Sequence, residues 1–404
     1  MQGVVESTEV SSLLAELTTF AGRCDPYPRY ERLRRIGPLV RADDGALVVT
    51  RYADCAAVTR DPRLGHFPTD MLGFIGLADW ADHPALRQLF LSMLLRNPPD
   101  HTRLRRLVSS SFTARRVQAL RPRIAAMVDD LLDEMSGTVD FVDAFAFPLP
   151  VNVIGELLGV PAPDRAQFQH LVRDSTRVLE VITPEVLAVA DPAAATIADY
   201  LAGLIAERRR KPGDDLISAL VATEGSGDQL DPDELVTMAG LLFVAGFETT
   251  TNLLANGLAA LLEHPGQRDL LAGSPELAAS ATEELLRFDS PVQLLSRVVF
   301  EPVELGGTTI DAGERVIAYL GAGNRDPERF TDPDRLDLAR ADNGPLSFGG
   351  GIHFCLGAPL ARLEAQVAFP ALLARFPALV GAGAPQRRDS LGIKGFISLP
   401  VDVG

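Results

Sequence analysis

The chain has 404 residues, of which 47% are hydrophobic and 23% are charged. This balance is typical of an ordered globular protein with a large core. The formal net charge of −16 would repel phosphate backbones, so we expect no nucleic acid partner. Because no Ser/Gly-rich linker divides the sequence, we expect a single domain over residues 1–404.

The N-terminal segment, residues 1–11, lacks the basic and apolar regions of a secretion signal. The longest uninterrupted apolar runs, such as 241–247, are far shorter than the roughly 20 residues that span a bilayer. The three cysteines, Cys24, Cys55 and Cys355, lie far apart, which argues against a disulfide framework. We therefore expect a cytoplasmic protein that does not span a membrane.

The elements expected along the chain are mostly helices, recognised by apolar residues at helical spacing. Thr113 and Asp231 stand at expected N-cap positions, and Pro232 takes a first helical position. In chain order, the sequence predicts strands at 39–41 and 46–50, helices at 113–135, 192–210, 231–263 and 275–288, strands at 298–305 and 315–320, and a helix at 358–375. The prediction is a mainly helical protein with small β-sheets.

The segment 348–357 reads Phe-Gly-Gly-Gly-Ile-His-Phe-Cys-Leu-Gly. Its glycines allow the backbone to approach a flat ligand and to turn N–H groups toward a sulfur anion. A helix beginning just after Cys355 would place that thiol at a helix N-terminus, where partial positive charge lowers a thiol pKa. On its own, Cys355 is better explained as an inert buried cysteine, the usual case for a lone thiol.

The same loop matches the signature Phe-x-x-Gly-x-x-x-Cys-x-Gly at Phe348, Gly351, Cys355 and Gly357. The chain therefore resembles the cytochrome P-450 family. The resemblance implies the P-450 fold, a triangular helical prism around a buried haem b, with Cys355 as the iron ligand and Phe348 and Gly357 against the haem. It also implies a small β-rich N-terminal lobe and a variable lid at 67–95.

Residues 242–250, inside the helix expected at 231–263, form a second feature. The Thr249 hydroxyl can bond back to the Ala245 carbonyl, which opens a groove in the helix, and Gly246 would keep that groove free of side chains. The resemblance places Ala245 and Gly246 against the haem and implies that Glu248 and Thr249 form the acid–alcohol pair that delivers protons to dioxygen. Without the resemblance, an ordinary core helix with a solvent-facing Glu248 and a back-bonding Thr249 explains these residues better, because Gly, Glu and Thr are common residues.

Charged residues supply two further features. Glu284 and Arg287 are spaced to share one helical face, and the resemblance implies a buried structural clamp that Arg335 completes. A different set would bind the haem propionates, since guanidinium groups suit carboxylates. By the resemblance this set consists of His101, Arg105, Arg297 and His353.

The resemblance implies a monooxygenase that receives electrons from NAD(P)H through a ferredoxin reductase and a ferredoxin. The ferredoxin would dock near Cys355, on Arg103, Arg106 and Arg362. Two alternatives stay open: haem-thiolate chemistry of another kind, such as peroxide-driven oxidation or oxidative coupling, and a recruitment module that has lost oxygen chemistry. The presence of Glu248 and Thr249 argues against the recruitment module.

The substrate pocket is expected to be largely apolar, which suits a small lipophilic substrate. The expected lining residues are Leu72, Phe74, Ile75, Leu241, Val244, Gln293, Leu294, Leu295 and Phe396. We therefore expect hydroxylation or epoxidation of a bulky secondary metabolite, such as a polyketide, macrolide, terpenoid or steroid, by a monomeric enzyme.

Overall fold

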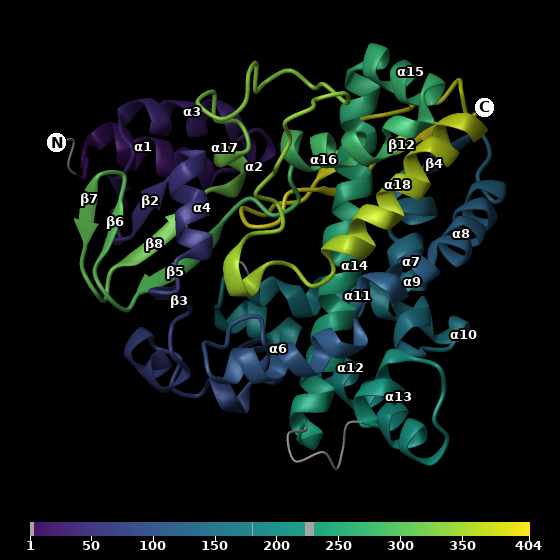
Figure 1. The fold of residues 1–404 in the computed structure, drawn as a ribbon, viewed down its shortest axis with the longest axis horizontal. Coiled ribbons are helices and arrows are strands. Elements are labelled where there is room, and N and C mark those ends of the chain that lie inside the picture. Colours follow the sequence, from purple (N-terminus) through teal and green to yellow (C-terminus); the bar gives the residue numbers. More distant parts are fainter. Residues whose placement is uncertain (1–3, 180, 223–229) are drawn as a thin grey trace.

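The computed structural model describes residues 4–179, 181–222 and 230–404. Figure 1 shows a β-rich lobe on one side, formed by the N-terminal segments together with later strands, and a helical body on the other. The long helix α14 runs through the middle of this body. The predicted class, mainly α with small β-sheets, is confirmed.

The β-rich lobe is built around a five-stranded sheet in the order β1-β2-β8-β5-β3. β2 and β8 pair in parallel, and the other neighbours are antiparallel. The strands of this sheet are β1 (Val40–Arg41), β2 (Leu47–Val49), β3 (Leu64–Gly65), β5 (Leu295–Val299) and β8 (Arg315–Ala318). The smaller sheets contain β4 (Thr138–Asp140), β6 (Val303–Leu305), β7 (Thr308–Ile310), β9 (Val380–Gly381), β10 (Gln386–Arg387), β11 (Phe396–Ser398) and β12 (Pro400–Asp402).

Helices cover the lobe and form the body (Figure 1). The α-helices are α1 (Thr8–Leu17), α2 (Phe20–Cys24), α3 (Tyr27–Ile36), α4 (Tyr52–Arg60), α5 (Pro84–Leu91), α6 (Asp100–Ser111), α7 (Ala114–Ala119), α8 (Arg121–Asp133), α9 (Pro148–Leu158), α10 (Ala162–Arg165), α11 (Phe168–Ser175), α12 (Pro184–Arg210), α13 (Leu216–Val221), α14 (Pro232–Glu263), α15 (Pro265–Gly273), α16 (Ala278–Phe288), α17 (Leu320–Gly323) and α18 (Ala358–Arg375). The 3₁₀ turns are η1 (Thr69–Ile75), η2 (Trp80–Asp82), η4 (Thr176–Leu179), η5 (Pro275–Leu277) and η6 (Gly351–His353), and η3 (Val142–Ala146) is π-helical.

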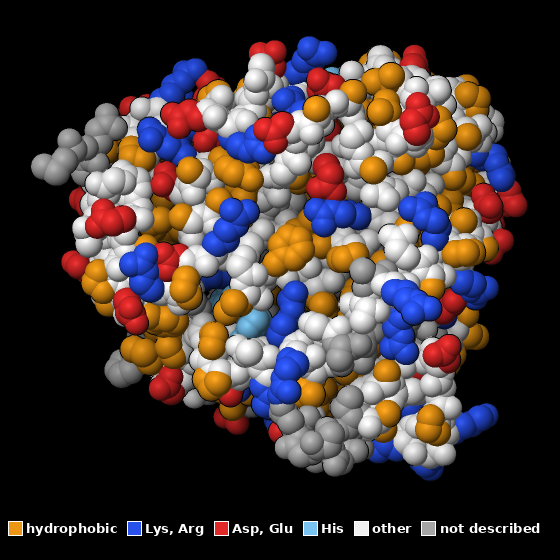
Figure 2. Space-filling model, in the orientation of Figure 1, with side chains coloured by type: hydrophobic (Ala, Val, Ile, Leu, Met, Phe, Trp, Pro, Cys, Tyr) orange, Lys and Arg blue, Asp and Glu red, His pale blue; other side chains and the backbone are white. Residues whose placement is uncertain are grey.

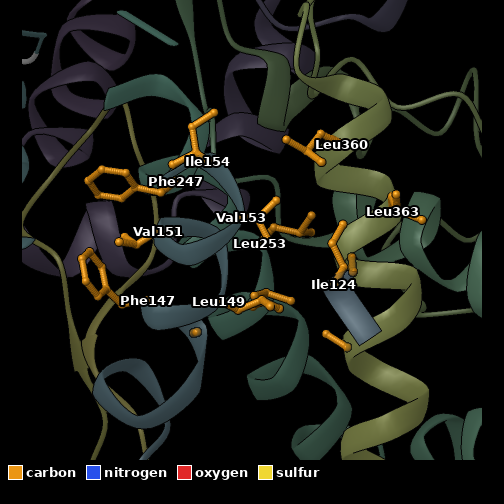
Figure 3. Close-up of a cluster of buried hydrophobic side chains, with 14 of the residues drawn as sticks. Ile124, Phe147, Leu149, Val151, Val153, Ile154, Phe247, Leu253, Leu360 and Leu363 are labelled. Carbon is orange, nitrogen blue, oxygen red and sulfur yellow. The ribbon is translucent and has the colours of Figure 1, made fainter. Parts of the chain in front are cut away.

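The central helix α14 begins with a capping box, in which Asp231 accepts from the Glu234 N–H at 2.8 Å and Glu234 accepts from the Asp231 N–H at 3.0 Å. This satisfies two backbone donors that a helix start leaves free. Figure 3 shows Val151 and Ile154 of α9 turned toward Phe247 of α14. Together with side chains of α18, they belong to the largest hydrophobic core cluster. Apolar contacts from α9 and α18 therefore hold α14 in place.

Two predicted helices, 231–263 and 358–375, match α14 and α18 closely. Thr113 caps as expected, accepting from the Arg116 N–H at 3.3 Å, but the helix expected at 113–135 is divided into α7 and α8. Pro122 stands in the first turn of α8, where a missing N–H is tolerated and a new helix is favoured.

The other boundaries differ for local reasons. The helix expected at 192–210 begins at Pro184, because Thr183 caps it and Pro192 is accommodated inside α12. The stretch 275–288 opens with the 3₁₀ turn η5 before α16. The strand expected at 298–305 is divided between β5 and β6 around Pro302, which has no N–H for a sheet ladder.

By length and composition alone, α12 and α14 could each cross a membrane. The most apolar window of α14 is 72% buried inside the protein, and that of α12 is 39% buried. α12 also packs against α5, α11 and α14. Both helices are therefore parts of the packed body, and they give only weak evidence for a membrane span.

Candidate active site

A cavity of about 610 Å³ lies between α14, the loop before α18, the start of β5 and the segment from α5 to α6. Its wall is mostly apolar, and its charged and titratable side chains include Glu248, Arg105 and Arg297. The sulfur-bearing residue Cys355 and the hydroxyl-bearing Thr249 both line it. The structure thus brings the two main sequence motifs to one cavity.

The loop that carries Cys355 is shaped by glycine. Gly349 and Gly351 have φ of 67° and 62°, a region that favours glycine. A Cβ on Gly351 would lie 2.6 Å from the carbonyl oxygen of Thr59, whereas a Cβ on Gly349 would meet nothing within 4 Å. A Cβ on Gly350 would likewise lie 2.5 Å from the Thr59 hydroxyl oxygen, so Gly350 and Gly351, unlike Gly349, allow the loop to lie against α4.

The thiol of Cys355 stands just before α18, as predicted. The N–H groups of Gly357 and Ala358 lower its pKa, and so do the guanidinium groups of Arg105 and Arg362. Burial raises the pKa by more, so the net direction is upward. The expected lowering of the thiol pKa by the helix N-terminus is therefore outweighed by burial.

In α14, the Thr249 hydroxyl donates to the Ala245 carbonyl at 3.1 Å, as the sequence predicts. Ala245 and Gly246 line the cavity. A Cβ on Gly246 would also meet the Ile154 side chain at 3.0 Å. The lack of a side chain at Gly246 therefore also allows α9 to pack closely against α14.

Glu248 is not the solvent-facing residue of a simple core helix. It is 6% exposed and forms an ion pair with Arg388, which follows β10. The Asn252 amide donates to the Glu248 carbonyl at 2.8 Å. Sequence reasoning missed Arg388, because nothing in its local pattern distinguishes it from a surface cation.

The loop between β10 and β11 has a second buried anchor. Lys394 pairs with Asp289, and the Tyr27 hydroxyl also donates to Asp289, at 2.6 Å. Between the two anchors, Gly392 and Ile393 line the cavity. Ion pairs to α14 and to the residue that follows α16 thus hold this part of the wall at both ends.

Imidazole and guanidinium groups gather at one end of the cavity. The rings of His101 and His353 lie 4.1 Å apart between centroids, and His66 stands edge-on to His353 at 4.7 Å. Arg105 donates to the Phe354 carbonyl at 2.7 Å, and Arg297 donates to that of Ser296 at 2.9 Å. All five residues line the cavity, so the four predicted propionate-binding residues do come together, and His66 joins them.

These groups have unmet hydrogen-bonding capacity. Burial and the neighbouring cations lower the pKa of His66 to about 2 and that of His353 to about 3, and burial alone lowers the pKa of Arg297 to about 10. Both ring nitrogens of His101, and Nε2 of His66 and His353, are buried without a hydrogen-bond partner. Within the described residues, Arg105 and Arg297 have no carboxylate partner. Two buried carboxylates would satisfy this set, so it fits the propionates of a haem.

The predicted clamp is present with one correction. The Arg287 guanidinium donates to Glu284 at 2.7 and 2.8 Å, and both side chains are 0% exposed. Arg335, expected as the third member, is exposed and contributes only its carbonyl oxygen, at 3.2 Å from Arg287. Arg340 takes the third position, because its Nε lies 3.1 Å from Glu284.

Four of the predicted pocket residues line the cavity, namely Leu241, Val244, Leu294 and Leu295. Three do not line it. Gln293 bonds instead to Ser290 and Tyr30, Phe396 packs beneath Arg387, and Leu72 packs in a separate hydrophobic cluster. The side chains of Phe74 and Ile75 lie outside the described residues.

Among the described residues of the lid segment, those that line the cavity lie in its second half. Lining residues that the sequence did not single out include Ala85, Gln88, Leu89, Ser92, Met93, Leu94, Leu95, Ser175, Thr176, Val178, Leu179 and Ile393. Leu94 and Leu179 line the cavity and are also exposed to solvent. They therefore mark a place where the cavity approaches the surface.

The three arginines expected at a docking surface differ in their surroundings. Arg103 pairs with Glu234 at the start of α14, Arg362 pairs with Glu283, and Arg106 is exposed. Figure 2 shows Lys and Arg side chains around the centre of the face on which α6 and α18 lie, with hydrophobic surface between them. The positive charge of Arg103 and Arg362 is thus partly neutralised within the protein.

The chain is similar to known proteins along its whole length. The family model described as Cytochrome P450 matches residues 79–271 and 276–400. Cytochrome P450 monooxygenase PikC of Streptomyces venezuelae is 44% identical, over 99% of this chain and 96% of the relative. The 6-deoxyerythronolide B hydroxylase of Saccharopolyspora erythraea is 40% identical, over 93% of this chain and 96% of the relative.

Among solved structures, P450BioI in complex with an acyl carrier protein ligated to hexadec-9Z-enoic acid superposes with a TM-score of 0.88. The two are 36% identical, and the match covers 95% of this chain and 99% of that one. The P450 fold expected from the sequence is thereby confirmed. This chain belongs to the cytochrome P450 family, which implies a haem-thiolate iron, and it is a monooxygenase.

Proposed function

We propose that this enzyme inserts one oxygen atom of dioxygen into a bulky lipophilic secondary metabolite of the polyketide, macrolide, terpenoid or steroid type, by hydroxylation or epoxidation. The observation that carries the proposal is a single cavity of about 610 Å³ with Cys355 and Thr249 on its wall and Arg105 and Arg297 at one end. The names of the relatives, among them a 6-deoxyerythronolide B hydroxylase and a polyketide biosynthesis cytochrome P450, favour the same class of substrate. The remaining wall is largely apolar and suits a lipophilic ligand.

In this proposal Cys355 ligates the haem iron, and His101, Arg105, Arg297 and His353 bind the propionates. Phe348, Ala245, Gly246 and Gly357 border the same space. The haem, when bound, supplies the activation of dioxygen. The protein supplies the sulfur ligand, the charge balance for the propionates and the placement of the substrate.

Glu248 and Thr249 are proposed to handle the protons. The Thr249 hydroxyl hydrogen is engaged by the Ala245 carbonyl, so its oxygen is available to accept a hydrogen bond from water in the cavity. Glu248, next to it, can hold a proton and exchange it with such a water. The pair would then pass protons into the cavity while the rest of α14 excludes bulk water.

Electrons are proposed to come from NAD(P)H through a ferredoxin reductase and a ferredoxin. Ile352 and Phe354, in the Cys355 loop, are 49% and 40% exposed, and Arg106 is exposed on α6. An apolar centre with cations nearby suits an acidic redox protein. We further propose that the chain acts as a single-domain, monomeric, cytoplasmic enzyme.

The assignment of Cys355 is tested by replacing it with serine. We expect the carbon monoxide complex of the reduced wild-type protein to show the absorption band of a thiolate-ligated haem, and Cys355→Ser to lose that band. Cys24→Ser removes the same atom far from the cavity and should keep the band. A wild-type protein that takes up haem but lacks the band would overturn the proposed function.

Replacing Thr249 by alanine should uncouple electron use from product formation. Product per NADPH should fall by roughly 10²-fold, within the range attributed to a positioned proton donor, with peroxide released instead. Thr251→Ala changes the same helix two residues away at a side chain that does not line the cavity and serves as the control. Coupling would be measured with a macrolactone or steroid that shifts the haem spin state. Unchanged coupling in Thr249→Ala would remove the proton role.

The other haem-thiolate chemistries are separated by the source of oxidising equivalents. We expect product when NADPH, ferredoxin and reductase are all present, and little product with hydrogen peroxide alone. Efficient turnover with peroxide alone would favour a peroxygenase instead.

A further inference from the structure

His66 lies beside the predicted propionate-binding residues, although the cysteine signature does not predict it. It follows β3 directly, and its ring stands edge-on to His353, at 86° and 4.7 Å between centroids. His353 in turn lies 4.1 Å from His101. Three imidazoles from β3, the cysteine loop and α6 thus form a row at the end of the cavity that Arg105 and Arg297 also line.

The backbone of His66 is held independently of its ring. The His66 N–H donates to the Asn97 side-chain oxygen at 2.8 Å, and the Asn97 amide donates to the His66 carbonyl at 2.7 Å. The preceding Gly65 has no room for a side chain, since a Cβ would lie 2.4 Å from Phe300 and 2.5 Å from the Asn97 oxygen. The contacts that fix the position of His66 are therefore made by its main chain, and its ring takes no part in them.

The ring of His66 has a buried nitrogen with nothing to bond. Nε2 is sealed from solvent and has no partner, although buried polar atoms are nearly always satisfied. Nε2 of His353 and both nitrogens of His101 share this condition. A carboxylate can accept several hydrogen bonds, so a single carboxylate can serve more than one ring nitrogen.

We propose that His66 is a further propionate-binding residue, donating an N–H to a haem carboxylate alongside His353 and His101. The inference rests on the haem proposed above. The two guanidinium groups balance the two negative charges, and the imidazole row provides neutral donors for the remaining carboxylate lone pairs. Packing of the row alone would leave the buried nitrogens without partners.

The test measures how tightly wild type and a His66 variant hold haem with and without free carboxylates. Wild type and His66→Phe are each reconstituted with haem b and with its dimethyl ester, which keeps the iron and the ring but removes the carboxylate charges. The rate of haem transfer to excess apomyoglobin is measured. We expect His66→Phe to release haem b about tenfold faster, which corresponds to about 1.4 kcal/mol, and to release the ester at nearly the wild-type rate.

Further variants make the outcome specific. His101→Phe should show the same dependence on the carboxylates, and His170→Phe, at an exposed position on α11, should change neither rate. His66→Gln retains an N–H donor, so it should release haem b more slowly than His66→Phe does. If His66→Phe does not fold, His66→Gln takes its place in the comparison. Equal acceleration with both haems, or none with either, would overturn the role of His66. That result would leave the thiolate assignment intact if the wild type keeps its absorption band.

Discussion

Replacing Glu284 by alanine is expected to lower the free energy of unfolding by about 3–5 kcal/mol, the usual cost of breaking a buried ion pair from one side. The Arg287 guanidinium is 0% exposed and would keep its charge without a counter-ion. Glu284 also accepts from the Asp337 N–H at 2.9 Å and from the Asn343 amide at 2.9 Å. Its loss would therefore also release the segment that leads to the cysteine loop.

The matched control is Arg335→Ala, since Arg335 is exposed and only its carbonyl oxygen takes part. This change should alter stability by less than about 0.5 kcal/mol. Urea unfolding followed by circular dichroism gives both values. Equal effects of the two substitutions would show that the network has been assigned to the wrong residues.

Gly351→Ala is expected to disrupt the cysteine loop, at a cost of about 2–5 kcal/mol. The positive φ of 62° accounts for roughly 1–2 kcal/mol. The 2.6 Å approach of the new Cβ to the Thr59 carbonyl adds about 1–3 kcal/mol, as overpacking does. The loop would have to leave α4, and the Cys355 sulfur would move with it.

Gly349→Ala separates these two contributions. Gly349 has a similar φ of 67° but open space around the new Cβ, so only the backbone cost should appear. The fraction of protein that shows the thiolate band after reduction under carbon monoxide would be measured for both variants. A Gly349 variant as impaired as the Gly351 variant would contradict the role given to the α4 contact.

Local signals predicted the helices that have clear ends. Asp231 and Pro232 mark the start of α14, and Gly357 precedes α18, so both ranges follow from the sequence. Pro192 misled the prediction, because a proline that begins a helix and one tolerated inside a helix look alike in the sequence. Pro192 stays inside α12 because Thr183, nine residues earlier, caps the helix and because α12 packs against neighbouring helices.

The site could be predicted where its chemistry is concentrated in short motifs. Cys355 and Thr249 belong to such motifs, and they do share one cavity. His66, Arg340 and Arg388 could not be found this way, because each meets its neighbours across a long sequence separation and has no local pattern of its own. Arg335 and Arg340 are five residues apart in an irregular segment, and only its three-dimensional path decides which guanidinium reaches Glu284.

Because the loop between β10 and β11 is held by an ion pair at each end, one part of the cavity wall is held more firmly than the rest. Arg388 and Lys394 fasten this loop to Glu248 and Asp289, so Ile393 cannot retreat without separating buried charges. On the other part of the wall, Leu94 and Leu179 reach solvent and carry no such charge. Ligands of different size would therefore be accommodated by displacement near Leu94 and Leu179, while the part of the wall that carries Ile393 would stay in place.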